Sequence, residues 1–241
     1  MQARHITSLA LVGALGFLGV SEVVRAQVVE HRSAIFVLVD LSQTWHRKDT
    51  LTRNEALLKR VADGVVALAG RTDRPTFVAF IGIESASMAR TLICEATYHP
   101  TLIRGTKRRV INKATELGDF LGTCSKGALS SPTAGWTDIS GALDLMQRQM
   151  GDEHQATERY AVVLSDMKEE RQYKAMVEPN LHGYRILVAY RVLPEDDRDP
   201  NGFKRRLSEW RDRLTRWGAS VTMVVDTGLV GEAIAGLARP K

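Results

Sequence analysis

Three short segments of the chain carry carboxylate and hydroxyl side chains of the kind that bind a hard metal ion. The first is the D-x-S-x-T sequence, which places Asp40, Ser42 and Thr44 in one tight turn. The second segment contains Thr137, and the third contains Asp166. Oxygen donors suit Mg²⁺, Mn²⁺ or Ca²⁺, and a few carboxylates with hydroxyls and water fit Mg²⁺ well. The sequence therefore predicts a divalent-metal site if the fold brings the three segments together.

Short β-branched runs alternate with helical patterns along the chain, and these elements must position the three segments. We expect strands at 33–39, 76–83, 90–98, 159–164, 185–192 and 220–225. We expect helices at 52–68, 102–121, 138–150, 203–217 and 229–237, and a loop at 122–136. This alternation predicts an α/β fold, a Rossmann-like three-layer sandwich with a mostly parallel sheet and helices on both faces. The short gap before 90–98 favours a hairpin, which makes that strand an antiparallel edge strand.

Ligands of such sheets bind outside the carboxyl ends of the strands. Asp40 ends the first expected strand, Asp166 follows the strand at 159–164, and Thr137 precedes the helix at 138–150. We therefore expect the three segments on one face of the fold. A purely structural interpretation stays open, because Ser, Thr and Asp are also common in turns and as helix N-caps.

The sequences DLSQT, WTDISGAL and VVLSDM resemble the three loops of a von Willebrand factor A domain, which build a metal-ion-dependent adhesion site. The resemblance spans about 33–237. It implies that Ser42 and Thr44 bind the metal directly, that Asp40 binds mainly through water, and that Thr137 and Asp166 complete the set. It also implies an open coordination position that a protein partner's carboxylate fills, so that the metal serves recognition and not catalysis. The chain has Met167 where the family usually has glycine.

Two tryptophans lie beside the expected ligands. Trp45 follows Thr44, and Trp136 precedes Thr137. Each residue either offers contact area to a partner or packs beneath its loop.

The same residues also allow an enzyme interpretation. An apolar strand that ends in Asp40 also resembles a haloacid-dehalogenase-type phosphatase, whose nucleophile is such an aspartate. That chemistry needs a second carboxylate two residues later, where this chain has Ser42. The sequence also lacks a G-x-S-x-G elbow, a G-x-x-x-x-G-K-[ST] loop and a C-x-x-C pair. We therefore expect a non-catalytic binding protein of a cell-envelope complex, and keep a Mg²⁺-dependent phosphohydrolase and a metal-free interaction domain as alternatives.

Residues 1–26 have the order of a secretory signal peptide, with a basic start, an apolar run and small residues before Gln27. The apolar run is shorter than the roughly 20 residues of a membrane-spanning helix. We expect cleavage to leave 27–241 as a single domain without a stable membrane span, periplasmic or secreted. In such an oxidising compartment Cys94 and Cys124 either pair or remain separate buried thiols.

The composition fits this assignment. Of 241 residues, 44% are hydrophobic and 25% charged, which excludes wholesale disorder. Only one stretch approaches a continuous apolar run, which excludes a polytopic membrane protein. The net charge of +5 is compatible with an acidic partner. An exported protein rarely meets nucleic acid, so we expect no nucleic-acid partner.

Overall fold

The computed structural model describes residues 33–47, 51–71, 75–84, 92–99, 110–153, 156–170 and 178–238. The expected signal peptide at 1–26 lies outside these ranges. The strands are β1 (Ser33–Asp40), β2 (Thr76–Ile83), β3 (Leu92–Tyr98), β4 (Val110–Ile111), β5 (Glu158–Ser165), β6 (Tyr184–Tyr190) and β7 (Ser220–Val224). The helices are α1 (Leu51–Ala69), α2 (Ala114–Ser130), α3 (Ile139–Glu153), α4 (Pro194–Arg198), α5 (Pro200–Arg216) and α6 (Val230–Gly236), with a 3-10 turn η2 (Thr227–Leu229) before α6.

The strands of the described residues form one seven-stranded sheet in the order β4-β3-β2-β1-β5-β6-β7. β1 pairs in parallel with β2 and β5, and β6 and β7 continue the parallel arrangement. β3 runs antiparallel to β2, as the short gap between them predicted, and the two-residue β4 lies outside it. The α/β class with a mostly parallel sheet is therefore confirmed.

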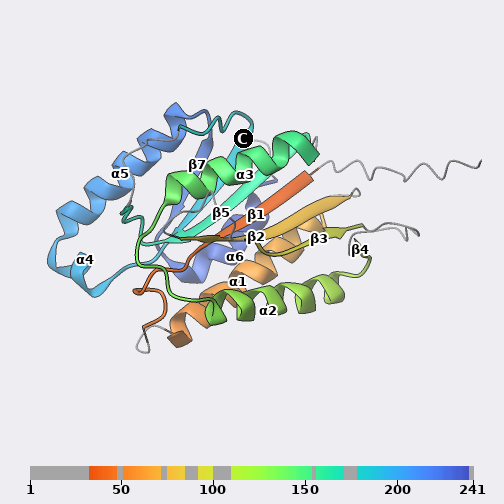
Figure 1. Cartoon of the computed structure of the whole chain (residues 1–241), viewed down its shortest axis with the longest axis horizontal. Coiled ribbons are helices and arrows are strands. Elements are labelled where there is room, and N and C mark those ends of the chain that lie inside the picture. The colour runs from red at the N-terminus through yellow and green to blue at the C-terminus, as the bar shows by residue number, and fades with distance from the viewer. Residues whose placement is uncertain are drawn as a thin grey trace, which may run out of the picture.

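Helices cover both faces of this sheet, which gives three layers (Figure 1). One hydrophobic core lies between the sheet and α1, α2 and α6, and a second lies beneath α3 and α5. All eight residues of β1 are buried, because a central parallel strand is covered on both sides. The carboxyl ends of the parallel strands lie together at the left of Figure 1.

A glycine allows α1 and α6 to pack closely. A Cβ atom at Gly64 would lie 2.8 Å from the carbonyl oxygen of Gly231 and 2.9 Å from Cβ of Ile234. Because any larger side chain would push the two helices apart, this position needs glycine.

The segment before α3 differs from the expectation. The helix predicted at 102–121 begins too early, since Val110–Ile111 forms β4 and α2 begins at Ala114. The loop predicted at 122–136 also begins too early, since α2 runs to Ser130. Residues 102–109 lie outside the described ranges. The Gly and Ser content of 122–130 suggested a loop, yet Leu121, Cys124 and Ala128 form one buried stripe. Packing of that stripe on the sheet outweighs the low helix propensity of its neighbours.

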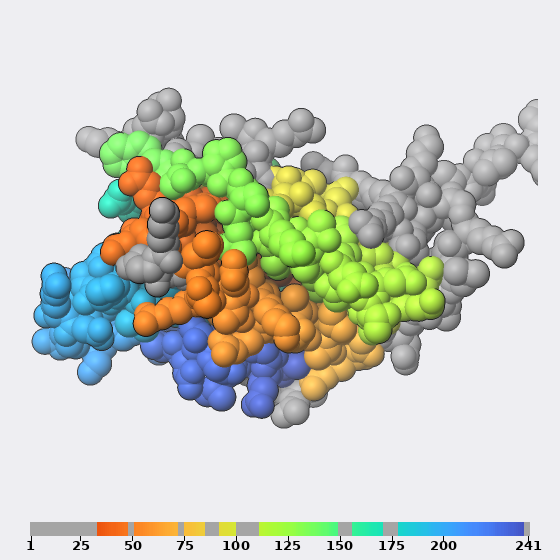
Figure 2. Space-filling model, turned by 90° about the horizontal axis from the view of Figure 1, so that it is seen from below, coloured from red at the N-terminus to blue at the C-terminus, as the bar shows by residue number. Residues whose placement is uncertain are grey.

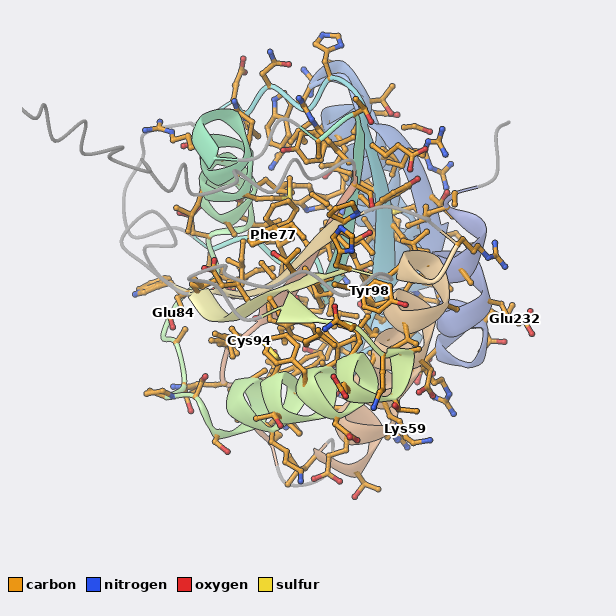
Figure 3. The ribbon with its side chains drawn as sticks, turned by 90° about the vertical axis from the view of Figure 1, so that its right-hand side faces the viewer. Lys59, Phe77, Glu84, Cys94, Tyr98 and Glu232 are labelled. Carbon is orange, nitrogen blue, oxygen red and sulfur yellow. A yellow bond between two sulfur atoms is a disulfide. The ribbon has the colours of Figure 1, made fainter. Side chains whose placement is uncertain are left out.

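The two cysteines form a disulfide that ties β3 to α2. Cys94 and Cys124 have Cα atoms 5.8 Å apart and are separated by 30 residues in sequence. Figure 3 shows Cys94 on the side of the sheet that α2 covers. This geometry favours the paired form over separate buried thiols.

Within the described part of the chain, no helix is long and apolar enough to cross a bilayer.

Candidate metal site

Asp40 occupies the carboxyl end of β1, where the chain turns into the first expected ligand loop. Its side chain is 2% exposed. Oδ1 accepts a hydrogen bond from the backbone N–H of Ser42 at 2.9 Å, and Oδ2 accepts one from the hydroxyl of Ser165 at 2.8 Å. The Oγ atom of Ser42 lies 2.8 Å from Oγ1 of Thr44. The D-x-S-x-T turn therefore holds a carboxylate and two neighbouring hydroxyls in a fixed arrangement.

Asp166 follows β5 and approaches this turn from the neighbouring strand. Its side chain is 5% exposed. Oδ1 accepts a hydrogen bond from the backbone N–H of Lys168 at 2.9 Å, and Oδ2 lies 3.5 Å from Oγ1 of Thr44. Because β1 and β5 are adjacent parallel strands, their carboxyl ends bring Asp40 and Asp166 to one point of the sheet edge.

Ser165 is a positioning residue that the sequence analysis did not identify. Its hydroxyl donates to Asp40 and accepts a hydrogen bond from the backbone N–H of Met167 at 2.9 Å. It therefore links the first ligand loop to the third. The only sequence signal for it is its place directly before Asp166.

The second loop contributes Thr137. This residue is 6% exposed and exchanges two backbone hydrogen bonds with Glu170, at 3.0 and 2.9 Å. The same loop is tied to the first by a hydrogen bond from the N–H of Ala134 to the carbonyl of Leu41 at 2.9 Å. The structure thus places Thr137 on a segment held between the first and third loops, although its contacts there are made by the backbone.

The two buried carboxylates influence each other. Burial raises the pKa of Asp40, against the hydrogen bonds from Ser42 and Ser165 that lower it. Burial, followed by the nearby charge of Asp40, raises the pKa of Asp166 to about 6. Two carboxylates that share a desolvated site repel each other unless a cation compensates them. The charge of Arg191 lowers both pKa values but leaves them raised, so a divalent cation between the three loops would complete that compensation.

The donor set fits a hard cation. Among the described residues, no cluster of three or more His, Cys, Asp or Glu side chains gathers at one point. A cation at this edge would therefore take most of its ligands from hydroxyl oxygens and water, together with the two carboxylates. Such a set of oxygen ligands suits Mg²⁺, Mn²⁺ or Ca²⁺ better than it suits zinc, which prefers nitrogen and sulfur ligands.

Met167 takes the backbone conformation for which glycine is usually needed. Its φ is 56°, in the left-handed region, and its side chain is 1% exposed. The departure from the family's glycine therefore leaves the turn intact, and buried side-chain packing compensates the backbone cost.

This conformation predicts an unusual order of stability between two variants at Met167. Both Met167→Gly and Met167→Ala lose the same buried side chain, but only glycine relieves the left-handed backbone. We expect the glycine variant to be more stable than the alanine variant by about 1 kcal/mol, the reverse of the usual order. Urea unfolding measures the difference, and an alanine variant at least as stable as the glycine variant would contradict it.

Arg191 is a charged residue near the site that the sequence analysis missed. It directly follows β6, is 7% exposed, and its guanidinium donates to the carbonyl oxygen of Thr44. Its charge lowers the pKa of both Asp40 and Asp166. The sequence predicted a strand at 185–192, which placed Arg191 inside that strand. The observed β6 ends at Tyr190, so Arg191 follows the strand at the edge that carries the candidate metal site.

The two tryptophans have different environments. Trp45 is 1% exposed, belongs to the core beneath α1, and lies with its ring centre 5.6 Å from the guanidinium carbon of Arg191. Of the two interpretations left open by the sequence, Trp45 therefore fits the structural one, because its indole packs beneath the loop. Trp136, in contrast, is 45% exposed at the surface.

Exposed apolar side chains gather at the same edge as the polar cluster. Six large hydrophobic residues of the described chain are exposed: Leu51, Leu92, Trp136, Val192, Val225 and Leu229. Each lies in a segment that begins or ends at the carboxyl ends of the parallel strands, including the start of the antiparallel β3. Exposed apolar side chains beside a cluster of polar groups are among the features of surfaces that bind other proteins.

No protein-family model matches the chain, and no curated protein matches it. Among solved structures, a von Willebrand factor type A protein from Catenulispora acidiphila is 11% identical with a TM-score of 0.47, over 86% of this chain and 42% of that one. The conserved hypothetical protein BatB from Bacteroides thetaiotaomicron is 14% identical with a TM-score of 0.45, over 85% and 96%.

A third similar structure is proximal thread matrix protein 1 from the mussel byssus, described with a zinc-occupied MIDAS motif. It is 10% identical with a TM-score of 0.46, over 87% of this chain and 48% of that one. The first of these three proteins carries the name of the family that the three loops resemble. These likenesses are too distant to carry a function to this chain, which must follow from its own residues.

Proposed function

We propose that this chain is a non-catalytic binding protein that holds a divalent cation and presents it to a carboxylate of a protein partner. Asp40, Ser42, Thr44, Thr137 and Asp166 would hold the cation, which would supply a fixed positive charge for recognition. Mg²⁺ is the expected ion, with Mn²⁺ or Ca²⁺ as alternatives, because all three take oxygen ligands.

The convergence of two buried carboxylates at one sheet edge carries this proposal. Asp40 and Asp166 approach each other closely enough for the charge of one to raise the pKa of the other. A purely structural pair of loops gains nothing from that repulsion, whereas a cation site needs both charges. The exposed apolar residues around the cluster, Trp136 among them, favour a macromolecular partner.

The Cys94–Cys124 disulfide supports the proposal that the protein works outside the cytoplasm. Disulfides persist in the periplasm and in secreted proteins and are rare in the reducing cytosol. We therefore place the protein in the periplasm or outside the cell, after removal of 1–26, as one domain over 27–241, and propose a cell-envelope complex as its setting.

The test is metal titration by calorimetry on purified protein that begins at Gln27, after chelator treatment. We expect saturable binding of Mg²⁺ or Mn²⁺ to the wild type, and no binding to a variant that combines Asp40→Ala with Thr137→Ala. A matched control combines Asp63→Ala with Thr133→Ala, since both residues are exposed and lie outside the site. Circular dichroism confirms that each variant is folded.

Absence of binding in folded wild type would overturn the metal site and leave the metal-free interaction domain. Mg²⁺-dependent hydrolysis of p-nitrophenyl phosphate that Asp40→Asn abolishes would instead favour the phosphohydrolase. We expect no such turnover, because the acid that this chemistry needs two residues after Asp40 is Ser42.

A further inference from the structure

A pocket of about 560 Å³ lies beside the metal site but uses different side chains. Its walls come from the first turns of α1, from the segment after β6 and from the segment after β7. In Figure 2 these parts, coloured orange, light blue and dark blue, adjoin one another at the left end of the molecule. A volume of this size accommodates a small ligand or a few residues of a peptide.

The charged lining of this pocket is strongly biased. Arg53, Arg60 and Arg191 line it, and Asp226 is its one acidic residue. Asp226 already accepts a hydrogen bond from the backbone N–H of Gly228 at 2.8 Å, and Arg191 already donates to the first ligand loop. Within the described ranges, no hydrogen bond or ion pair involves the guanidinium of Arg53 or Arg60. Two cationic groups of the pocket are therefore available to an anion.

The rest of the lining is partly apolar. Val192 and Val225 are 41% and 39% exposed, and Leu57 and Ala56 extend the apolar wall along α1. No aromatic side chain lines the pocket, so nothing there would stack on a base. Guanidinium groups pair with carboxylates through two parallel hydrogen bonds. The pocket thus combines carboxylate recognition with an aliphatic contact.

We propose that this pocket binds an acidic, aliphatic peptide segment of a protein partner, independently of any metal. Arg53 and Arg60 pair with acidic side chains of the segment, and Val192 and Val225 contact its aliphatic side chains. The pocket opens on the same edge as the candidate metal site, so one partner can occupy both. The binding itself needs neither the cation nor Asp40.

The test uses a fluorescein-labelled peptide of alternating Glu and aliphatic residues, Glu-Val-Glu-Leu, with EDTA present throughout. Fluorescence anisotropy compares it with the neutral Gln-Val-Gln-Leu and the polar Glu-Ser-Glu-Ser. We expect the first peptide to bind at least about tenfold more tightly than either analogue, and its affinity to fall as salt increases.

Protein variants assign this binding to the pocket. We expect a variant with Arg53→Glu and Arg60→Glu to bind the acidic peptide at least about tenfold more weakly. Lys59→Glu is the matched control, since Lys59 lies on the same helix, is 81% exposed and does not line the pocket (Figure 3). Lys59→Glu and Asp40→Ala should both bind as the wild type does.

Several results would overturn the proposal. They are no binding by the wild type, equal binding of the neutral peptide, unchanged binding by the double arginine variant, or an equal loss in Lys59→Glu. Loss of peptide binding in Asp40→Ala with EDTA present would show that the pocket is not independent of the metal loops. Because the metal site is tested by calorimetry without peptide, the two proposals fail separately.

Discussion

Replacing Asp166 with asparagine is expected to stabilise the metal-free protein by about 2 to 3 kcal/mol at pH 7.5, measured by urea unfolding. The substitution keeps the size of the side chain and the oxygen that accepts a hydrogen bond from Lys168. It removes a buried negative charge that lies close to Asp40. A pKa that rises from 3.8 to about 6 on folding corresponds to about 3 kcal/mol.

The sign of this effect depends on pH. The folded state holds the proton of Asp166 more tightly than the unfolded chain does, so protonation favours folding. The contribution of Asp166 to stability is complete below pH 3.8 and is lost as pH rises through about 6. The advantage of Asp166→Asn should therefore be largest above about pH 6 and disappear near pH 4. Measuring the difference between variants separates Asp166 from all other titrating groups.

The same substitution should abolish metal binding, so saturating Mg²⁺ or Mn²⁺ should stabilise the wild type alone. A residue that lowers the stability of the metal-free protein but is required for metal binding is typical of a functional site. Asp119→Asn is the control, since Asp119 is exposed on α2 and should change stability by less than about 0.5 kcal/mol. A destabilising Asp166→Asn with unchanged metal binding would support purely structural loops.

The sequence was sufficient to place the first and third loops at one edge of the sheet, because Asp40 and Asp166 lie at strand ends. Asp40 follows an apolar run directly and Asp166 follows one after Ser165, and adjacent parallel strands must bring both to one edge. The residues that stabilise the site were harder to predict. Arg191 was not identified because the predicted end of β6 was two residues too late. The burial of Trp45 depends on packing beneath α1. Neither has a signal of its own in the residue pattern.

The length of α2 illustrates a different limit of the sequence. Gly122, Ser125, Gly127 and Ser130 indicate a loop when propensity alone is considered. The helix nevertheless continues, because its buried stripe packs on the sheet and a disulfide joins it to β3. Such tertiary support is not visible in a window of sequence, and the same support makes α2 sensitive to loss of the disulfide.

Loss of that disulfide gives the second large prediction. A variant with Cys94→Ala and Cys124→Ala should be less stable than the oxidised wild type by about 3 to 4 kcal/mol in urea unfolding. The estimate comes from the loop of 30 residues that the crosslink closes in the unfolded chain. Because the crosslink joins β3 to α2 and not the ligand loops, metal affinity of the folded variant should stay unchanged.

Reduction of the wild type by dithiothreitol is the matching control, since it removes the crosslink and leaves both sulfur atoms in place. We expect the reduced wild type to lose about as much stability as the double alanine variant, with a small further loss in the variant because Cys124 is buried. A loss below about 1 kcal/mol in both proteins would contradict the prediction. Such a result would mean that packing of α2 on the sheet suffices without the bond.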